Sequence, residues 1–227
     1  MHILGTRTDL IILDVDGVIL DILAGLKKNL EITAEHFKLN PAPIAQSLTD
    51  IASGKTRIKG NARDSTRMLW PHVSERQISE FVEHFYEVER EHPYPLIPGS
   101  KETLWFFHHR GIPLALATNN PKDVLDWRLE DAGIDASWFA AITTKDDKYF
   151  KPHPKTFDPI FERIAVPRHN AIYIGDLQID WDTARRTGVT FVAVLSGGVP
   201  RHAFVAEGVP DTHILPVLSH ILDHIED

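Results

Sequence analysis

The stretch DLIILDVDGVILDI, residues 9–22, decides the fold of this chain and raises its main chemical question. Four consecutive apolar residues, 10–13, predict a strand that is buried on both faces, as in a parallel sheet. Asp14, Asp16 and Asp21 then follow within eight residues. Carboxylates this close repel one another, and each raises the pKa of the others unless a positive charge lies between them. The stretch therefore predicts a buried strand that ends in a group of acids in need of a positive partner.

The composition is that of an ordinary globular protein and argues against several functions. The chain has 227 residues, of which 43% are hydrophobic and 25% charged, and this length suits one large domain or a core with an insertion. The net charge of −8 argues against general nucleic-acid binding. The absence of cysteine excludes disulfides and thiolate metal sites. The start lacks an apolar signal region, and no apolar run approaches the roughly 18 residues of a membrane span. We expect a cytoplasmic protein without nucleic-acid or membrane partners, and the oligomeric state stays open.

From about residue 96 onward, short apolar runs alternate with amphipathic segments, which is the pattern of a parallel sheet with crossover helices. The predicted strands are residues 10–13, 113–118, 139–143, 171–175 and 189–195. Ser100 is a candidate cap for a helix that Gly111 stops, and Asn120 with Pro121 starts a helix that Gly133 ends. Pro154 is predicted to open a third helix. This part predicts a doubly wound, Rossmann-like α/β core.

Residues from about 22 to 95 interrupt the alternation and contain only helix-like stretches. Ser74 and Gln77 fit a capping box, and apolar residues then follow at helical spacing. We therefore expect an all-helical cap domain, residues 22–95, inserted into an α/β core made of residues 1–21 and 96–227. Such a cap would lie over the carboxyl ends of the strands, where open α/β sheets bind ligands.

Four short motifs follow predicted strands in order: DVDG with Asp14, Asp16 and Gly17, ATNN with Thr118 and Asn119, KPHP with Lys151, and GDLQID with Asp176 and Asp180. Because the carboxyl ends of parallel strands meet at one edge, these side chains are expected to share one crevice. Gathered carboxylates suit Mg²⁺, and a carboxylate can also act as a nucleophile. A second carboxylate could carry a proton, while a lysine and a hydroxyl could hold phosphoryl oxygens.

In these four motifs the chain resembles the haloacid dehalogenase-like (HAD) hydrolases, and within them the phosphoglycolate phosphatase-like phosphatases with a helical cap after the first motif. The resemblance covers nearly the whole chain. It implies a Mg²⁺-dependent phosphatase that hydrolyses a phosphate monoester of a small metabolite through an aspartyl-phosphate. Dehalogenating relatives typically lack an acid at the position of Asp16, so its presence favours phosphoryl chemistry.

Carried over residue by residue, the resemblance implies a role for each motif. Asp14 would be the nucleophile and a metal ligand, and Asp16 the general acid and base, with its backbone carbonyl on the metal. Gly17, Thr118 and Asn119 would bind the phosphate. Lys151 would neutralise the nucleophile and the phosphate. Asp176 would complete the metal site, and Asp180 would support it directly or through water.

Other functions are compatible with the same residues. A phosphomutase or a phosphonate hydrolase could use the same core, and the latter would need a cap lysine, for which Lys55 and Lys59 are candidates. A non-catalytic protein that binds a phosphorylated ligand is the alternative from a different class.

The stretch GKTRIKGNARDSTR, residues 54–67, gathers five cations in an acidic protein. The ordinary explanation is a solvated face of the cap. The alternative hypothesis is that one or two of them, with Arg57 and Lys59 as the candidates, bind an anionic part of the substrate beyond its phosphate.

Overall fold

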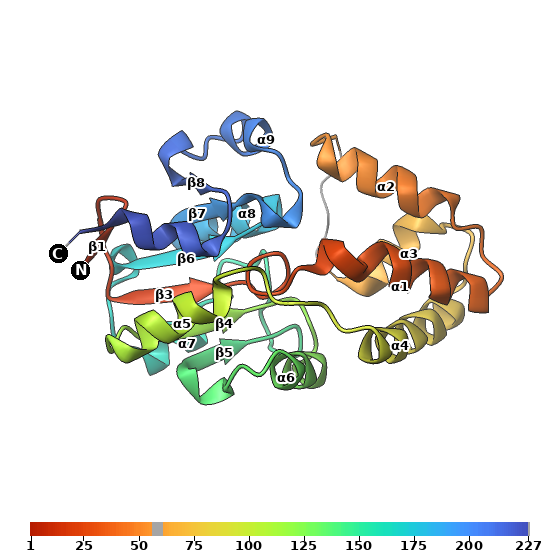
Figure 1. Cartoon of the computed structure of the whole chain (residues 1–227), viewed down its shortest axis with the longest axis horizontal. Coiled ribbons are helices and arrows are strands. Elements are labelled where there is room, and N and C mark those ends of the chain that lie inside the picture. The colour runs from red at the N-terminus through yellow and green to blue at the C-terminus, as the bar shows by residue number, and fades with distance from the viewer. Residues whose placement is uncertain (56–60, 227) are drawn as a thin grey trace.

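The computed structural model describes residues 1–55 and 61–226, which form a parallel sheet with helices around it and a group of four helices at one end (Figure 1). The strands are β1 (His2–Ile3), β2 (Thr6–Arg7), β3 (Leu10–Leu13), β4 (Leu114–Ala117), β5 (Phe139–Thr143), β6 (Ala171–Gly175), β7 (Thr190–Val194), β8 (Ile214–Leu215) and β9 (Ile225–Glu226). The α-helices are α1 (Ile22–His36), α2 (Ala42–Ala52), α3 (Ala62–Leu69), α4 (Glu75–Glu91), α5 (Ser100–His109), α6 (Lys122–Asp131), α7 (Asp158–Arg163), α8 (Gln178–Thr187) and α9 (Arg201–Ala206). Short 3-10 helices are η1 (Ala136–Trp138), η2 (Arg168–Asn170), η3 (Leu195–Gly197), η4 (Asp211–His213) and η5 (Leu218–His224).

The main sheet has six parallel strands in the order β5-β4-β3-β6-β7-β8. Strand β3 lies between β4 and β6, with Leu13 opposite both Leu116 and Ile174. The residues that follow these three strands therefore emerge side by side. All five predicted strands are confirmed, and the predicted doubly wound class with them.

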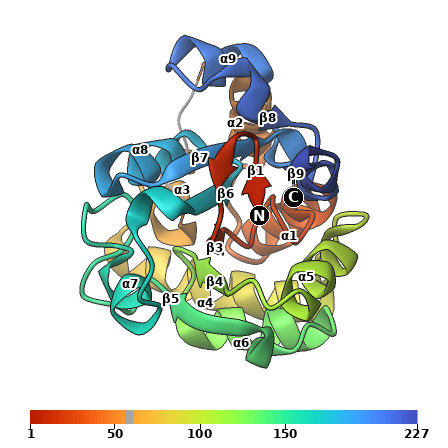
Figure 2. The same ribbon diagram turned by 90° about the vertical axis from the view of Figure 1, so that its left-hand side faces the viewer.

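Helices cover both faces of the sheet, as Figure 2 shows from the end that carries the chain termini. Ile11 and Leu13 of β3 pack toward Leu104 of α5 and its neighbours, whereas Leu10 and Ile12 pack toward Phe157 and the α7–α9 side. All four β3 residues are buried, which explains the uninterrupted apolar run.

Helices α1–α4 form the cap at the end of the molecule opposite the termini (Figure 1). The cap has its own apolar cluster, in which Trp70, Phe81 and Phe85 are buried. The two connections to the core run antiparallel: Leu20 bridges Leu96, and the Asp21 N–H donates to the Pro95 carbonyl over 2.8 Å. This pairing supports the proposed domain boundary near residues 22 and 95.

Two predicted helix starts are wrong. Ser100 is the first residue of α5, not its cap, because its hydroxyl is buried and donates to the Ile19 carbonyl over 3.1 Å. Helix α7 begins at Asp158 instead of Pro154, because the intervening residues form turns. The capping box is confirmed: the Gln77 N–H donates to the Ser74 hydroxyl, and the Ser74 N–H donates to the Gln77 side chain.

Among the described residues, we find no helix whose length and apolar character would allow it to cross a membrane.

Candidate active site

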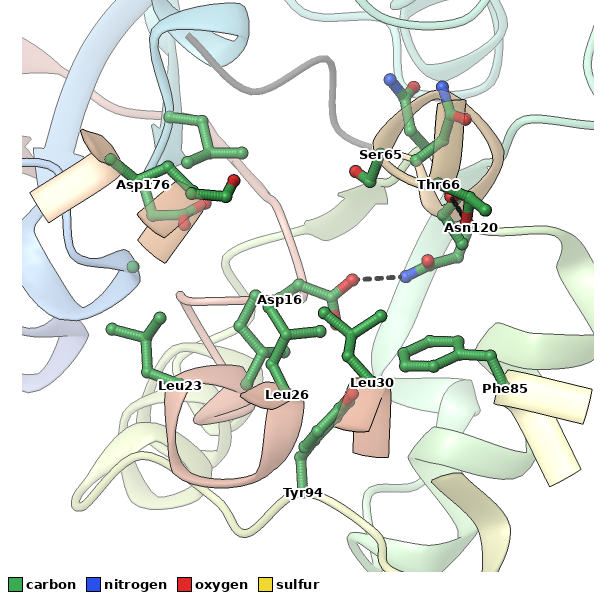
Figure 3. Close-up of a pocket in the computed structure, with 18 of the residues that line it drawn as sticks. Asp16, Leu23, Leu26, Leu30, Ser65, Thr66, Phe85, Tyr94, Asn120 and Asp176 are labelled. Carbon is green, nitrogen blue, oxygen red and sulfur yellow. Dashed lines mark hydrogen bonds between the residues drawn. The ribbon is translucent and has the colours of Figure 1, made fainter. Parts of the chain in front are cut away.

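The motifs of the core converge on one cavity between the carboxyl end of the sheet and the cap (Figure 3). Six of the residues predicted for the site line it, namely Asp14, Asp16, Thr118, Asn119, Lys151 and Asp176. They come from the segments after β3, β4 and β6 and from the loop after β5. The shared edge of the parallel strands brings together residues that are more than 150 positions apart in sequence.

Lys151 is the positive partner that the opening stretch requires. Its ammonium lies 2.8 Å from Asp14 Oδ2 and 2.8 Å from Asp180 Oδ1, and it donates to the Tyr173 hydroxyl over 3.1 Å. Only 3% of the Lys151 side chain is exposed. An ion pair between groups this buried holds the lysine in one position beside the Asp14 carboxylate.

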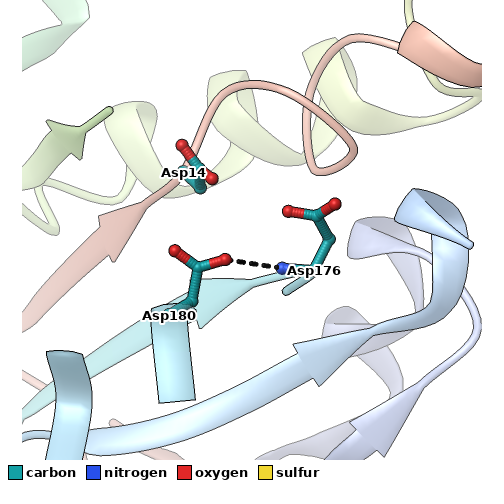
Figure 4. A group of neighbouring side chains, drawn as sticks. All are labelled: Asp14, Asp176 and Asp180. Carbon is teal, nitrogen blue, oxygen red and sulfur yellow. Dashed lines mark hydrogen bonds between the residues drawn. The ribbon is translucent and has the colours of Figure 1, made fainter. Parts of the chain in front are cut away.

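Asp176 is unusual because both of its carboxylate oxygens are buried and accept no hydrogen bond from the described residues. One oxygen each from Asp14, Asp176 and Asp180 lie within 4.8 Å of one another (Figure 4). Unpartnered buried carboxylate oxygens are costly, and a hard divalent cation such as Mg²⁺ would satisfy them. The residues therefore fit the predicted metal.

Two glycines make room for this carboxylate. A Cβ added at Gly17 would lie 2.2 Å from Asp176 Oδ2, and one at Gly197 would lie 1.7 Å from the same atom. Gly17 also has a φ of 71°, in the left-handed region that favours glycine. Gly17 thus allows the close approach of the first and last motifs. Its role in binding the phosphate stays a prediction.

Asp180 has a supporting place. Its Oδ1 accepts from Lys151 and, over 2.6 Å, from the Tyr173 hydroxyl, whereas its Oδ2 accepts from the Asp176 and Leu177 N–H groups. The carboxylate therefore fixes both the lysine and the backbone that carries Asp176.

Asp16 lies apart from this group, and its carboxylate is held by residues that the sequence did not single out. Arg128 of α6 donates to both Asp16 oxygens, over 2.7 and 2.8 Å, and the Asn120 side-chain amide donates over 2.7 Å. Arg128 also binds both oxygens of Glu89, which is fully buried near the end of cap helix α4. The signal in the sequence that could have indicated Arg128 is its place among the apolar positions of α6. Asn120 was predicted only to start this helix.

Burial and neighbouring charges change the pKa values of three groups in the site. Burial raises the pKa of Asp14 to about 7, with Lys151 opposing and the Asp180 and Asp16 carboxylates adding to the effect. The pKa of Asp176 is raised well above its usual value by burial and by the neighbouring carboxylates. Burial disfavours the charge of Lys151, but Asp14 and Asp180 outweigh it and raise the lysine pKa.

Thr118 and Asn119 lie at the carboxyl end of β4. The Thr118 hydroxyl accepts from the Asn120 N–H over 3.2 Å, and the Asn119 side-chain amide donates to the Lys151 carbonyl over 3.1 Å. The Asn119 Oδ1 atom is buried without a donor. These contacts place the second motif against the loop that carries the lysine.

The basic stretch of the cap is only partly described. Arg57 and Lys59 lie outside the described residues, so their predicted role stays a prediction. Arg63 and Arg67 pair with Glu75 at the start of α4, over 3.3 and 2.7 Å. These two arginines fit the ordinary explanation of a solvated cap face.

The fold and site define a capped α/β protein with an acidic, metal-competent cavity at the carboxyl end of its sheet. The family model described as haloacid dehalogenase-like hydrolase matches residues 11–194, and the chain belongs to this family. The match includes every motif residue from Asp14 to Asp180.

Similar proteins agree with this assignment. The chain is 26% identical to a phosphoglycolate phosphatase of Yersinia pseudotuberculosis, over 92% of this chain and 88% of the relative. It is 28% identical to a phosphoglycolate phosphatase of Mesorhizobium japonicum, over 93% and 90% of the two chains. A haloacid dehalogenase-like family protein from Streptococcus pneumoniae has a similar fold, with a TM-score of 0.76 at 18% identity over 97% of this chain and 99% of the other.

Proposed function

We propose that the protein is a Mg²⁺-dependent phosphatase that hydrolyses a phosphate monoester of a small molecule through an aspartyl-phosphate on Asp14. The observation that carries the proposal is the buried pair of Asp14 and Lys151 beside the unpartnered Asp176 carboxylate. The names of the curated relatives support the reaction class.

The first step would be displacement at phosphorus. A carboxylate oxygen of Asp14 forms a bond to phosphorus while the bond from phosphorus to the alcohol oxygen breaks, and protonated Asp16 gives its proton to that oxygen. Lys151 and the donors of Thr118 and Asn119 would hold the equatorial phosphoryl oxygens. Mg²⁺ held by Asp14 and Asp176, with Asp180 in support, would supply positive charge to the phosphoryl group.

The second step would return the enzyme to its starting state. Asp16, now a carboxylate, accepts a proton from a water molecule, and the water oxygen attacks phosphorus and releases Asp14 and inorganic phosphate. Arg128 and Asn120 hold the carboxylate form of Asp16, which is the form that accepts the proton from water in this step. Asp16 would contribute its backbone carbonyl to the metal, because its side chain faces these two donors.

A phosphonate hydrolase of this fold would need a cap lysine near the phosphorus. Among the described residues that line the cavity, Lys151 of the core is the only lysine. Lys59 lies outside the described residues, so reduction with borohydride in the presence of an aldehyde substrate remains the test for that alternative.

The proposal is tested by phosphate release from p-nitrophenyl phosphate and a panel of phosphorylated metabolites, with Mg²⁺ and with EDTA. We expect turnover with Mg²⁺ that EDTA removes and that Asp14→Asn lowers by at least about 10³-fold, because the nucleophile is lost. Asp21→Asn is the matched control, since Asp21 lies outside the cavity, where its side chain accepts from the Ala24 N–H, and asparagine can also cap α1. Equal turnover in Asp14→Asn and the wild type would contradict the mechanism.

A further inference from the structure

Among the described residues that line the cavity, all those with a charged side chain belong to the core. The volume of the cavity is about 160 Å³, and its floor is formed by the motif residues. Its walls and roof come from all four cap helices, with Leu23, Leu26, Leu30, Leu48, Met68 and Phe85 among the lining side chains (Figure 3). The part of a substrate that extends beyond its phosphate would therefore meet an apolar surface.

The described cap residues that line the cavity bring no charge to it. Their polar members are Ser47, Asn61, Ser65, Thr66, Tyr86 and Tyr94. Two of these are already engaged: Asn61 accepts from the Asp64 N–H at the start of α3, and Thr66 donates to the Ala62 carbonyl.

The two cations among the described lining residues are both neutralised. Lys151 pairs with Asp14 and Asp180, and Arg128 pairs with Asp16 and Glu89. A carboxylate on the substrate, as in phosphoglycolate, would be desolvated in this cavity, and the described residues offer no unpaired cation to bind it. Burial of an unpaired carboxylate is strongly unfavourable.

The lining also includes exposed apolar side chains. Leu23 is 41% exposed and Met68 is 45% exposed, and both line the cavity. Large apolar side chains left accessible beside a polar, convergent site are typical of ligand-binding pockets. Leu23 of α1 and Met68 of α3 are therefore accessible apolar contacts for a ligand in this cavity.

We propose that the alcohol part of the substrate is an uncharged, apolar group that fills this cavity. The inference rests on the proposed phosphatase function and adds to it the class of substrate. A dry apolar cavity of about 150 Å³ accommodates benzene, and the present cavity of about 160 Å³ also holds the phosphate at its floor, so it has room for a small apolar alcohol. The glycolate group that the names of the relatives suggest is a poor match for it.

The test compares kcat/KM for unbranched alkyl phosphates from methyl to octyl with that for phosphoglycolate, using the full chain with Mg²⁺. We expect about a fourfold rise for each added methylene until the cavity is full, since each buried methylene favours binding by that factor. Phosphoglycolate is expected to do no better than methyl phosphate.

The variant Met68→Lys tests the same inference by placing a positive charge in the cavity lining. A lysine at this partly exposed lining position is expected to lower kcat/KM for hexyl phosphate and to raise it for phosphoglycolate, each by about tenfold. Val205→Lys on α9 is the control, because Val205 is 46% exposed and is not part of the cavity lining.

The outcomes separate this inference from the proposed function. Two results would overturn the inference about the apolar substrate and leave the phosphatase proposal in place. One is hydrolysis of p-nitrophenyl phosphate with the same kcat/KM for every alkyl phosphate, and the other is phosphoglycolate as the best substrate. Loss of phosphoglycolate turnover in Arg57→Ala or Lys59→Ala would then identify the cation responsible. If no ester, including p-nitrophenyl phosphate, is hydrolysed, the phosphatase proposal fails and the inference fails with it.

Discussion

The three acids of the opening stretch have three different surroundings. Asp14 lies against Lys151, Asp16 lies between Arg128 and Asn120, and Asp21 caps α1. The sequence located all three acids because they follow a recognisable strand. It could not distinguish their partners, because Arg128 is 112 positions from Asp16 and reaches it only through the tertiary fold.

At the same scale, the raised pKa values of Asp14 and Asp176 predict how metal binding depends on pH. Without metal, Asp14 keeps its proton at pH values where the unfolded chain has lost it, so it makes the folded state less stable as the pH rises from about 4 to about 7. The raised pKa of Asp176 acts in the same direction. Mg²⁺ must displace these protons. We therefore expect Mg²⁺ to raise the Tm more at pH 8 than at pH 5, as measured by calorimetry.

Asp176→Asn is the control for this measurement. The variant keeps the shape of the side chain but lacks the anionic ligand, so the Mg²⁺-induced change in Tm should be small at both pH values. An equal Mg²⁺ effect at pH 5 and pH 8 in the wild type would show that these carboxylates are not the groups that bind the ion.

At the scale of elements, strands were easier to predict than helix ends. Strands β3, β4, β6 and β7 are apolar runs that are buried on both faces, and the edge strand β5 is an apolar run with alternating burial, so local composition was sufficient. Strand β8 has only two residues and offers no such run. The start of α5 was misplaced because Ser100, a typical cap residue, instead uses its hydroxyl to bind the carbonyl of Ile19, 81 positions away.

The capping box of α4 gives a prediction at this scale. Ser74→Ala removes the acceptor for the Gln77 N–H, and we expect it to lower the free energy of unfolding by about 1 kcal/mol. Ser74→Asp should restore most of that loss, because aspartate also caps helices. Urea denaturation measures both, and an alanine variant as stable as the wild type would mean that packing of α4 alone sets its start.

At the scale of the whole molecule, Arg128 joins the cap to the loop that carries Asp16. It binds Glu89 of α4 on one side and Asp16 on the other, and 6% of its side chain is exposed. Burial raises the pKa of Glu89, although Arg128 opposes the shift, so Glu89 would be left as a costly buried acid if the arginine were lost. One side chain therefore contacts both α4 and the Asp16 carboxylate.

This link predicts a defect that depends on the leaving group. In Arg128→Met combined with Glu89→Gln, which avoids an unpaired buried acid, Asp16 is less well oriented to protonate the leaving oxygen. We expect kcat for alkyl phosphates to fall by about 10- to 100-fold, and kcat for p-nitrophenyl phosphate to fall far less, because nitrophenolate leaves without a proton.

Glu89→Gln alone is the control for that double variant, since it keeps Arg128 beside Asp16. Equal losses on the two kinds of ester would assign Arg128 a structural role instead of a positioning one.

The paired connections between core and cap have a consequence for how such a molecule can diversify. Leu20 and Leu96 lie across one antiparallel bridge, so the chain leaves and re-enters the core at almost the same point. The entropic cost of closing a loop grows only slowly with its length, by about 0.6 kcal/mol for each doubling. The core can therefore tolerate insertions of very different size at this point, and the inserted helices can change while the strand order and the motif residues stay unchanged.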